Sequence, residues 1–434
     1  MKTQRGFVYI LALVVVLVTT AVSLTLARSV ALRTQAQQAA TARTQCRAAA
    51  TGVLRAIMTD LNATMAAGSV PSLTTVTPAS ESVGDCTVIL VGRDPSGTSL
   101  RCGLIPTSGK LTVGHATVDQ LAALPGMTTA IAAALVDWCD LDDEVDPNGG
   151  AERTDGAYAG ASIPFAPRNA APELSDEFRL VRDVTDSLYF GEDRNGNGML
   201  DIGEDDNGDG QLTLGLRDLL TVDAREPGSG VDVTKGGTAK ALGDLMTQSI
   251  SGQRGIDLKT QAEKLWPFPS RLKMLLDLGL TEEEATTLWA KLSEGNNRVG
   301  LVDAWSCPTS VLFALTNDEG LDATIVAARP TTAPTSPLWL AQALGAQVDT
   351  YGRLFTFGSF LFDFDLLAVR NDGAGWARLQ GTIDCSLPSG TPVLNQLRPA
   401  ETQGWPFPWA TLAMLRRGDA GSDVATFLTT PATR

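Results

Sequence analysis

The sequence predicts an α+β fold in which a long N-terminal helix packs on an antiparallel sheet and a large helical domain is inserted into that sheet. Three observations lead to this prediction. A charge-free apolar run from Phe7 to Ala27 continues into an Ala-rich and Gln-rich segment without proline. Alternating apolar and polar residues occur in two distant regions, 86–105 and 351–384, with helical patterns between them. A loop inside the helical region has the spacing of a calcium-binding loop.

The N-terminal apolar run is long enough to cross a membrane. As a helix it spans roughly 30 Å, the thickness of the hydrocarbon layer of a bilayer. It is longer than the core of a cleaved secretory signal and has no obvious small-residue cleavage site. Lys2 and Arg5 precede it without an acidic residue, which predicts that the leader stays on the cytoplasmic side. We expect the helix to continue as a stalk to about Leu61 and to end before the Pro-, Ser- and Thr-rich segment 68–80.

Composition narrows the class of protein. The 434 residues suffice for two or three compact units, and the net charge of -15 disfavours nucleic acid as a partner. Six cysteines occur without CxxC spacing, which argues against a zinc or redox motif, and His115 is the only histidine. Nothing supports an enzyme. Outside the cytoplasm disulfides become possible, and Cys86 with Cys102, which flank a candidate hairpin, are the first pair to consider.

The region after this hairpin predicts paired helices. Thr117 is a candidate N-cap, Leu121 and Leu124 share one face, and a Pro-Gly turn precedes a second helix through Ala130 to Trp138. This pattern resembles a helix-hairpin-helix. DNA-binding versions have a second glycine after the turn, which is absent here, and an acidic run follows directly. We therefore interpret the unit as a packing module that does not bind DNA.

A weaker copy of this pattern occurs at residues 302–315, and Gly320-Leu321 aligns with Gly126-Met127. Two further helices are predicted between the copies, at 272–280 and 281–292, the second with Thr281 as its N-cap. The two copies indicate one helical domain built from paired hairpins.

The C-terminal part returns to strand patterns. Segments 351–363, 366–371 and 377–384 alternate apolar and polar residues, so we expect three strands that complete the sheet begun at Cys86. Residues 399–434 are expected to form a loosely packed tail with a short helix from Trp409 to Arg417.

The predicted calcium loop runs from Asp193 to Glu204. Gly198 supplies the turn at loop position six, and hard oxygen ligands at this alternation suit Ca²⁺. A second, partial loop follows directly, but its twelfth position is Leu216, and Asp218 is a possible substitute. Because the loops abut, we expect one helix, a double loop and a second helix starting near Leu212. The candidate ligands of the two loops are Asp193, Asn195, Asn197, the carbonyl of Met199, Asp201, Glu204, Asp205, Asn207 and Asp209.

The leader resembles that of type IV prepilins. In Arg5-Gly6-Phe7 the resemblance implies that a prepilin peptidase cuts after Gly6 and leaves Phe7 as the first residue. Pilin-like subunits commonly have a glutamate as the fifth mature residue, where this chain has Leu11. A carboxylate in lipid is costly without a partner, so its absence fits a subunit with nothing stacked above it. That pattern is typical of the K-type minor pseudopilin.

An ordered series of segments resembles the helical domain of general secretion pathway protein K, although the family commonly has asparagines in place of Thr112 and Gly114. The segments are 109–127, 136–144, 150–152, Tyr158, 167–169 and 177–182.

The resemblance implies a pilin-like fold divided as follows: leader 1–6, transmembrane helix 7–27, stalk and first strands 28–110, inserted helical domain 111–345 with calcium-binding loops 193–210, last strands 346–398, and tail 399–434.

The same resemblance implies a non-enzymatic tip subunit of the type II secretion pseudopilus, anchored once in the inner membrane with its body in the periplasm. Its implied partners are the I-type and J-type minor pseudopilins, the major pseudopilin and the prepilin peptidase, and it implies calcium binding. One alternative is a calcium-dependent surface binding protein on an uncleaved anchor, and another is a minor pilin of a type IV or DNA-uptake pilus.

Overall fold

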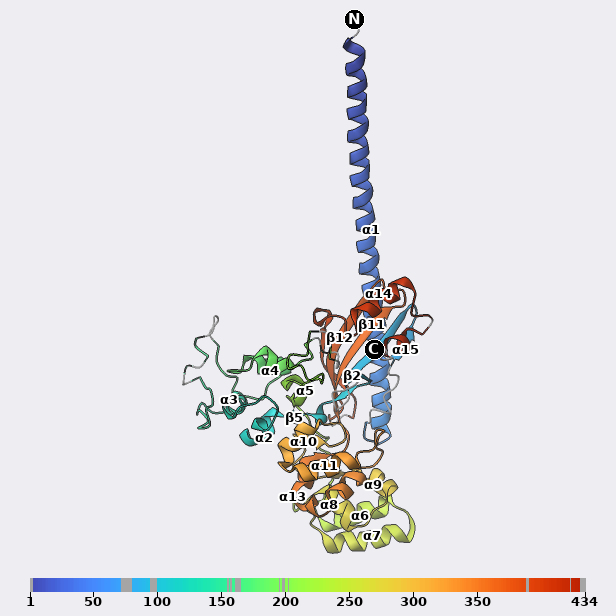
Figure 1. The fold of residues 1–434 in the computed structure, drawn as a ribbon. Coiled ribbons are helices and arrows are strands. Elements are labelled where there is room, and N and C mark those ends of the chain that lie inside the picture. Colours follow the sequence, from blue (N-terminus) through green and yellow to red (C-terminus); the bar gives the residue numbers. More distant parts are fainter. Residues whose placement is uncertain are drawn as a thin grey trace.

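The computed structural model of the chain describes residues 3–71, 80–93, 100–153, 156, 158–160, 165–194, 196, 200–201, 203–387, 390–421 and 423–429. Figure 1 shows a body at one end of a single long helix, α1 (Thr3–Ala66). This helix has 64 residues, which corresponds to about 96 Å. From Tyr9 to Thr41 its side chains are exposed, and from Ala42 onward one face is buried. Among the described residues, α1 is the one helix long and apolar enough to cross a membrane.

The sheet lies against the buried half of α1. Its main path runs in the order β1-β2-β11-β12-β13 with antiparallel neighbours, while β3 pairs with β2 and β4 pairs with β11. The first core fills the space between helix and sheet, with Val53, Ile57 and Leu61 of α1 packed against Phe362 and Phe364. The strands are β1 (Ser80–Val83), β2 (Cys86–Arg93), β3 (Leu100–Cys102), β4 (Ile105–Pro106), β11 (Leu361–Arg370), β12 (Trp376–Asp384) and β13 (Val393–Pro399).

The C-terminal segment covers the opposite face of the sheet. Helices α14 (Trp409–Arg417) and α15 (Val424–Thr429) bury Leu412, Leu415 and Leu428 with Trp405 against β2 and β11. The predicted helix at Trp409–Arg417 is confirmed. The expectation of a loosely packed tail is wrong, because this segment supplies a second core of its own.

The largest unit is inserted between β4 and β11. It has its own core, built around buried residues such as Phe178, Leu272 and Trp289. Figure 1 places it at the end of the body away from the N-terminus of α1. Its helices are α2 (Val118–Ala122), α3 (Thr129–Cys139), α4 (Asp186–Phe190), α5 (Leu216–Leu219), α6 (Ala239–Ser249), α7 (Gly252–Leu265), α8 (Arg271–Asp277), α9 (Glu282–Trp289), α10 (Thr309–Thr316), α11 (Glu319–Ala328), α12 (Leu338–Leu344) and α13 (Val348–Tyr351).

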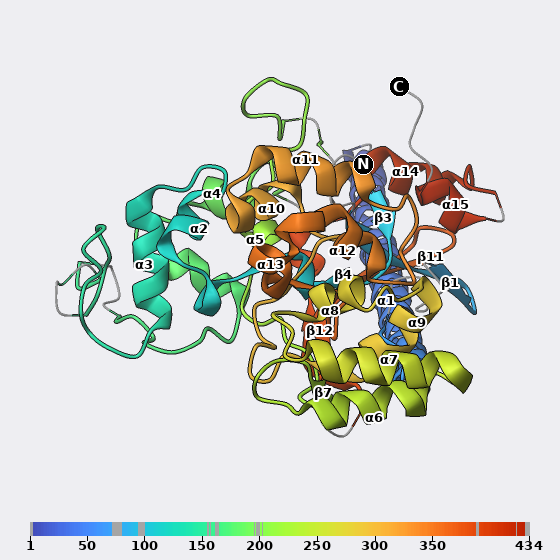
Figure 2. The same cartoon turned by 90° about the horizontal axis from the view of Figure 1, so that it is seen from below.

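Short parallel strand pairs hold the ends of segments together inside this unit. They are β5 (Leu111–Thr112) with β6 (Leu220–Thr221), β7 (Val231–Asp232) with β8 (Leu292–Ser293), and β9 (Val302–Asp303) with β10 (Phe355–Thr356). Seen from below, α2, α3 and α4 form a lobe to one side of the helices α6 to α13 (Figure 2).

Both predicted helix pairs are present as helices. Thr117 and Gln120 form a capping box at the start of α2, and α3 follows after the Pro-Gly turn. The second pair is α10 and α11, but Gly320 lies inside α11 and its turn is formed by Asn317 in a left-handed conformation. The expected alignment of Gly320 with Gly126 is therefore wrong.

Two expectations about strands also differ from the structure. Segment 351–363 is not one strand, because Tyr351 ends α13 and Phe355–Thr356 pairs with β9 inside the inserted unit. Segments 361–363 and 366–371 instead belong mainly to the single strand β11, and β13 was not expected as a strand. β13 is an edge strand with mostly exposed side chains, which leaves little apolar alternation to find.

Candidate functional site

The predicted calcium loops lie between α4 and α5, beside the sheet. The chain leaves α4 through Gly191, which is close enough to the returning strand segment that a Cβ there would lie 2.3 Å from the carbonyl oxygen of Thr213. The Glu192 carboxylate, buried behind this turn, accepts backbone N–H groups of Asp206 and Thr213 at 3.1 and 2.8 Å. The second helix begins at Leu216 and not near Leu212 as expected, because residues up to Leu214 pair with Gly191.

Two carboxylates of the first loop are buried in the protein interior. Asp193 is fully buried, and Glu204 is 8% exposed. The two oxygens of Glu204 accept the backbone N–H groups of Arg194 and Asp201 at 3.2 and 3.1 Å, so this carboxylate closes the loop from its far end. Asn195, Asn197 and Met199, with the turn residue Gly198, lie outside the described residues.

The second loop is at the surface. Asp205 accepts the backbone N–H groups of Gly208 and Gly210, and Asn207 and Asp209 each accept the N–H two residues further on. These side-chain oxygens therefore organise turns of the loop itself. Leu216, at the position of the missing twelfth ligand, is fully buried in α5.

Arginine side chains fasten the first loop to its surroundings. Arg217 donates to the carbonyl oxygen of Asp193 at 2.8 Å, and its own carbonyl oxygen accepts a hydrogen bond from Lys110, which also pairs with Asp363 of β11 at 3.2 Å. Arg378 of β12 is fully buried and donates to the carbonyl oxygen of Gly196 at 2.8 Å. Charged side chains outside the loop thus donate hydrogen bonds to its backbone carbonyl oxygens and join it to the sheet.

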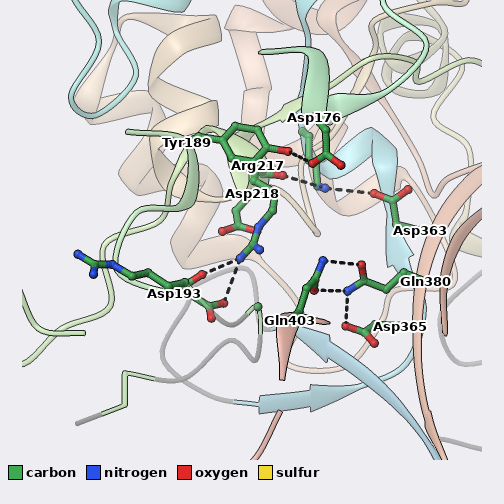
Figure 3. A network of polar contacts seen from close by, with 12 residues as sticks. Asp176, Tyr189, Asp193, Arg217, Asp218, Asp363, Asp365, Gln380 and Gln403 are labelled. Carbon is green, nitrogen blue, oxygen red and sulfur yellow. Dashed lines mark hydrogen bonds and ion pairs between the residues drawn. The ribbon is translucent and has the colours of Figure 1, made fainter. Parts of the chain in front are cut away.

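A cleft of about 580 Å³ lies between the inserted unit and the sheet. Figure 3 shows part of it, with Tyr189 donating to Asp176 at 2.9 Å and Gln380 joined to both Asp365 and Gln403. Most of its named polar groups are engaged with one another. We therefore interpret the cleft as part of a hydrogen-bonded interface between the inserted unit and the sheet.

A second group of carboxylates was not predicted as a site. Asp137 and Asp140 at the end of α3 converge with Glu152, and their nearest ligand atoms all lie within 4.8 Å of one another. Among the described residues this is the one group of three metal-competent side chains that meets this distance. Asp137 and Glu152 are 1% and 0% exposed. Gly150 permits this approach, because a Cβ there would lie 2.0 Å from a carboxylate oxygen of Asp137.

The electrostatics of this cluster favour a cation. Burial raises the pKa of Asp137 and of Glu152, and burial together with the neighbouring Asp142 and Asp137 raises the pKa of Asp140 to about 6. One oxygen of Asp140 and one of Glu152 are buried without a hydrogen-bond partner among the described residues. Buried carboxylate oxygens need a partner, and a hard divalent cation is one that satisfies several at once.

The sequence analysis interpreted Asp137 and Asp140 as part of an acidic run that repels phosphate, and it did not connect Glu152 with them. Their convergence depends on a loop of more than ten residues folding back onto α3, and no fixed ligand spacing signals that. One available signal was the small Gly150-Ala151 pair directly before Glu152, since small residues permit a close backbone approach.

Residues 108–190 match a family model described as "Type II secretion system (T2SS), protein K". This range contains α2, α3, α4 and the Asp137 cluster, and it ends before the loops at 193–210. One similar solved structure is a chain in "The Crystal Structure of the GspK-GspI-GspJ complex from enterotoxigenic Escherichia coli Type 2 Secretion System". It has 14% identity and a TM-score of 0.45, over 85% of this chain and 99% of that one. Among curated proteins, none matches the chain.

A long N-terminal helix packed on an antiparallel sheet, with a helical unit inserted in that sheet, is the arrangement that the sequence led us to expect of a pilin-like fold, and α1 is long and apolar enough to cross a membrane. Within this fold, the segment 108–190 is similar to protein K of the type II secretion system.

Proposed function

We propose that the chain is a minor pseudopilin of the protein K family, that it forms the tip of the type II secretion pseudopilus, and that it acts as a structural component of protein export across the outer membrane. The observation that carries the proposal is the protein K segment, which lies in a bulky unit at the end of the body away from the N-terminus of α1 (Figure 1). In a filament of parallel helices, a unit placed there would obstruct a subunit stacked above it. The proposed role requires no catalytic site.

The N-terminal helix supports the same position. Leu11, where stacked pilin-like subunits have a glutamate, is an exposed apolar residue of α1. A subunit at the top has no neighbour above whose terminal ammonium needs a carboxylate, and an unpaired carboxylate in lipid is costly. The proposal places α1 in the inner membrane and the body in the periplasm.

The proposed partners are the I-type and J-type minor pseudopilins, with the major pseudopilin below them. The similar solved structure is of a complex whose title names GspK, GspI and GspJ. Copurification of the full chain with its cognate I-type and J-type subunits from detergent-solubilised membranes tests this partnership, and recovery of the chain without either would contradict it.

Processing by a prepilin peptidase is the first test of the proposal. Coexpressed with its cognate peptidase, the membrane-extracted chain is expected to begin at an N-methylated Phe7, as an intact mass measurement would show. A Gly6→Leu variant, changed at the cleavage position, is expected to keep its leader, whereas Gly52→Ala, in a part of α1 with open space around it, is expected to be processed normally. An uncut wild-type chain would favour the surface binding protein on an uncleaved anchor.

We also propose that the inserted unit binds calcium structurally. Asp137, Asp140 and Glu152 would hold one ion, and the loop at Asp193–Glu204 would hold a second through the ligands expected from its spacing. Bound Ca²⁺ would offset the repulsion of buried carboxylates. The Asp137 cluster supports this proposal with an all-oxygen donor set and buried oxygens without partners.

Calorimetric titration of the chelator-treated full chain with CaCl₂ tests calcium binding. Glu152→Gln is expected to weaken one site about tenfold or more, and Glu204→Gln the other, because each removes a ligand charge. Glu144→Gln, an exposed acid of the same run as Asp137, is the matched control and is expected to bind as the wild type does. Equal weakening by the control would indicate diffuse electrostatic attraction in place of specific ligands.

A further inference from the structure

Two cysteines from distant parts of the chain meet where the stalk enters the body. Cys46 lies in the first buried turns of α1, and Cys86 is the first residue of β2. Their sulfur atoms are 3.7 Å apart. Both side chains belong to the core between helix and sheet, with exposed fractions of 0% and 3%.

The surroundings hold this pair in register. Cys86 lies opposite Arg370 at the end of β11, and the Cys46 thiol donates to the carbonyl oxygen of Gly375 at 3.4 Å in the turn that follows. Gly375 touches α1 closely, since a Cβ there would lie 2.6 Å from the Cβ of Ala42. The two sulfurs are therefore brought together by packing of the helix, the strand and this turn.

The pairing of Cys86 with Cys102 that the hairpin suggested does not fit the strand register. Cys102 lies opposite Val91 on β2, five positions along from Cys86. Among the described residues, Cys139, Cys307 and Cys385 have no sulfur neighbour in hydrogen-bonding distance. Cys46 and Cys86 are thus the pair that the fold selects.

We propose that Cys46 and Cys86 form a disulfide that ties the stalk helix α1 covalently to strand β2. This inference rests on the proposed periplasmic location, where disulfides persist. Each thiol loses its proton, the two sulfurs give up two electrons and form one S–S bond, and a disulfide of an exchange partner accepts the electrons and protons to become two thiols. Bond formation requires the sulfurs to approach to about 2 Å, a movement within reach of side-chain rotation.

The bond is expected to form while the chain folds. Burial, followed by the neighbouring Cys86, raises the pKa of the Cys46 thiol to about 12. The attacking species in disulfide exchange is the thiolate, so the folded, reduced core reacts slowly. Once formed, the bond is protected from reductants because both cysteines are buried and a reductant cannot reach them.

Peptide mapping tests the proposal on the full chain extracted from the cell envelope. Trypsin places the three candidate cysteines in separate peptides, 44–47 with Cys46, 56–93 with Cys86 and 102–110 with Cys102. After alkylation of free thiols in denaturant without reductant, we expect peptides 44–47 and 56–93 to be recovered joined, and to separate on reduction. Recovery of both as alkylated free thiols, or of 56–93 joined to 102–110, would overturn the proposal.

The reduced chain is also refolded in a mixture of oxidised and reduced glutathione. This experiment distinguishes whether the geometry supports the bond from whether the cellular location of the protein allows it. Absence of the 44–47 to 56–93 link there would show that the geometry does not support the bond. If the link forms in glutathione but the protein from the cell has free thiols, the proposed disulfide does not exist in the cell. That result would also contradict the proposed periplasmic location.

Melting curves give a readout that does not depend on peptide recovery. Reductant is expected to lower the Tm of the wild type but not that of Cys46→Ala or Cys86→Ala. Cys385→Ala is the matched control, because it also removes a fully buried thiol from the same core, and it is expected to keep its sensitivity to reductant. Equal sensitivity of all four proteins would contradict the cross-link.

Discussion

At the scale of single residues, the packing of the C-terminal segment on the sheet depends on one tryptophan. Trp405 is 1% exposed, donates to the hydroxyl of Thr411 at 3.0 Å and contacts the rings of Trp376 and Phe407 edge-on. It fills the space between the sheet and α14. Its removal leaves a cavity that neighbouring rings cannot collapse into without losing their own contacts.

We therefore predict that Trp405→Ala lowers the free energy of unfolding by about 3–5 kcal/mol. Trp409→Ala is the matched control, because Trp409 begins α14 but is 63% exposed, and its change is expected to stay within about 0.5 kcal/mol. Denaturant titration followed by circular dichroism measures both. Similar losses for the two variants would mean that α14 does not pack on the sheet as described.

The Asp137 cluster illustrates at the same scale what the sequence conceals. Each acid was visible in the sequence, but the burial of Glu152 against Asp137 was not. A loop that satisfies fixed spacing, such as 193–204, is found from local pattern alone. Convergence across a fold-back depends on tertiary packing, which a single sequence does not display.

At the scale of elements, the inserted helices are set by local capping signals. Thr281 and Glu284 form a capping box at the start of α9, and Glu284 also accepts two hydrogen bonds from Arg254 of α7 at 2.8 and 2.9 Å. The hydrogen bond from Arg254 is the main cause that lowers the pKa of Glu284. One side chain thus both caps a helix and joins it to its neighbour.

This contact predicts a pH-dependent loss in Glu284→Gln. Glutamine keeps the capping acceptor but loses the charge, so the cost at pH 7 is expected to be about 0.5–1 kcal/mol. Because the folded pKa of Glu284 lies below its ordinary value of 4.5, its contribution is complete above that value and is lost as the pH falls below it. Unfolding curves of both proteins between pH 7 and pH 3 should therefore converge at the acidic end.

Glu282→Gln is the control for this measurement, since Glu282 is an exposed acid in the same first turn. It is expected to show a smaller difference from wild type across the range. A pH-independent deficit in Glu284→Gln would indicate lost packing in place of lost charge.

Elements with strong local signals were the ones the sequence predicted well. The starts of α2 and α9 follow their threonine caps, and α14 has the predicted bounds, Trp409–Arg417. The alternation at 351–363 predicted a strand, but α13 and the turn after it pack on α8. In short apolar segments such tertiary contacts decide between helix and strand. The register of the sheet, which brings Cys46 to Cys86, required the structure.

At the scale of the whole molecule, the body contains separate cores on either side of a polar interface. The inserted unit has one core, and the sheet has others on its two faces. Between them lie charged contacts such as Arg225 with Asp384 at 2.7 Å and Lys110 with Asp363 at 3.2 Å. Such an interface couples two units less strongly than a shared apolar core does.

We predict two thermal transitions for the detergent-solubilised full chain in scanning calorimetry. Added Ca²⁺ is expected to raise the transition of the inserted unit and to leave that of the sheet unchanged, because ligands stabilise the unit that binds them. In Glu152→Gln the shift is expected to shrink, which assigns the transition. A single transition that moves as a whole would show that the two units unfold together.

The pairing of Ile105 with Asp363 and of Pro106 with Phe362 places both ends of the inserted unit side by side on one strand pair. The unit therefore occupies the position of a hairpin loop. In terms of chain connectivity, residues added to or removed from the unit leave the order and register of the sheet strands unchanged. The size of the unit is therefore independent of the geometry of the sheet and of α1.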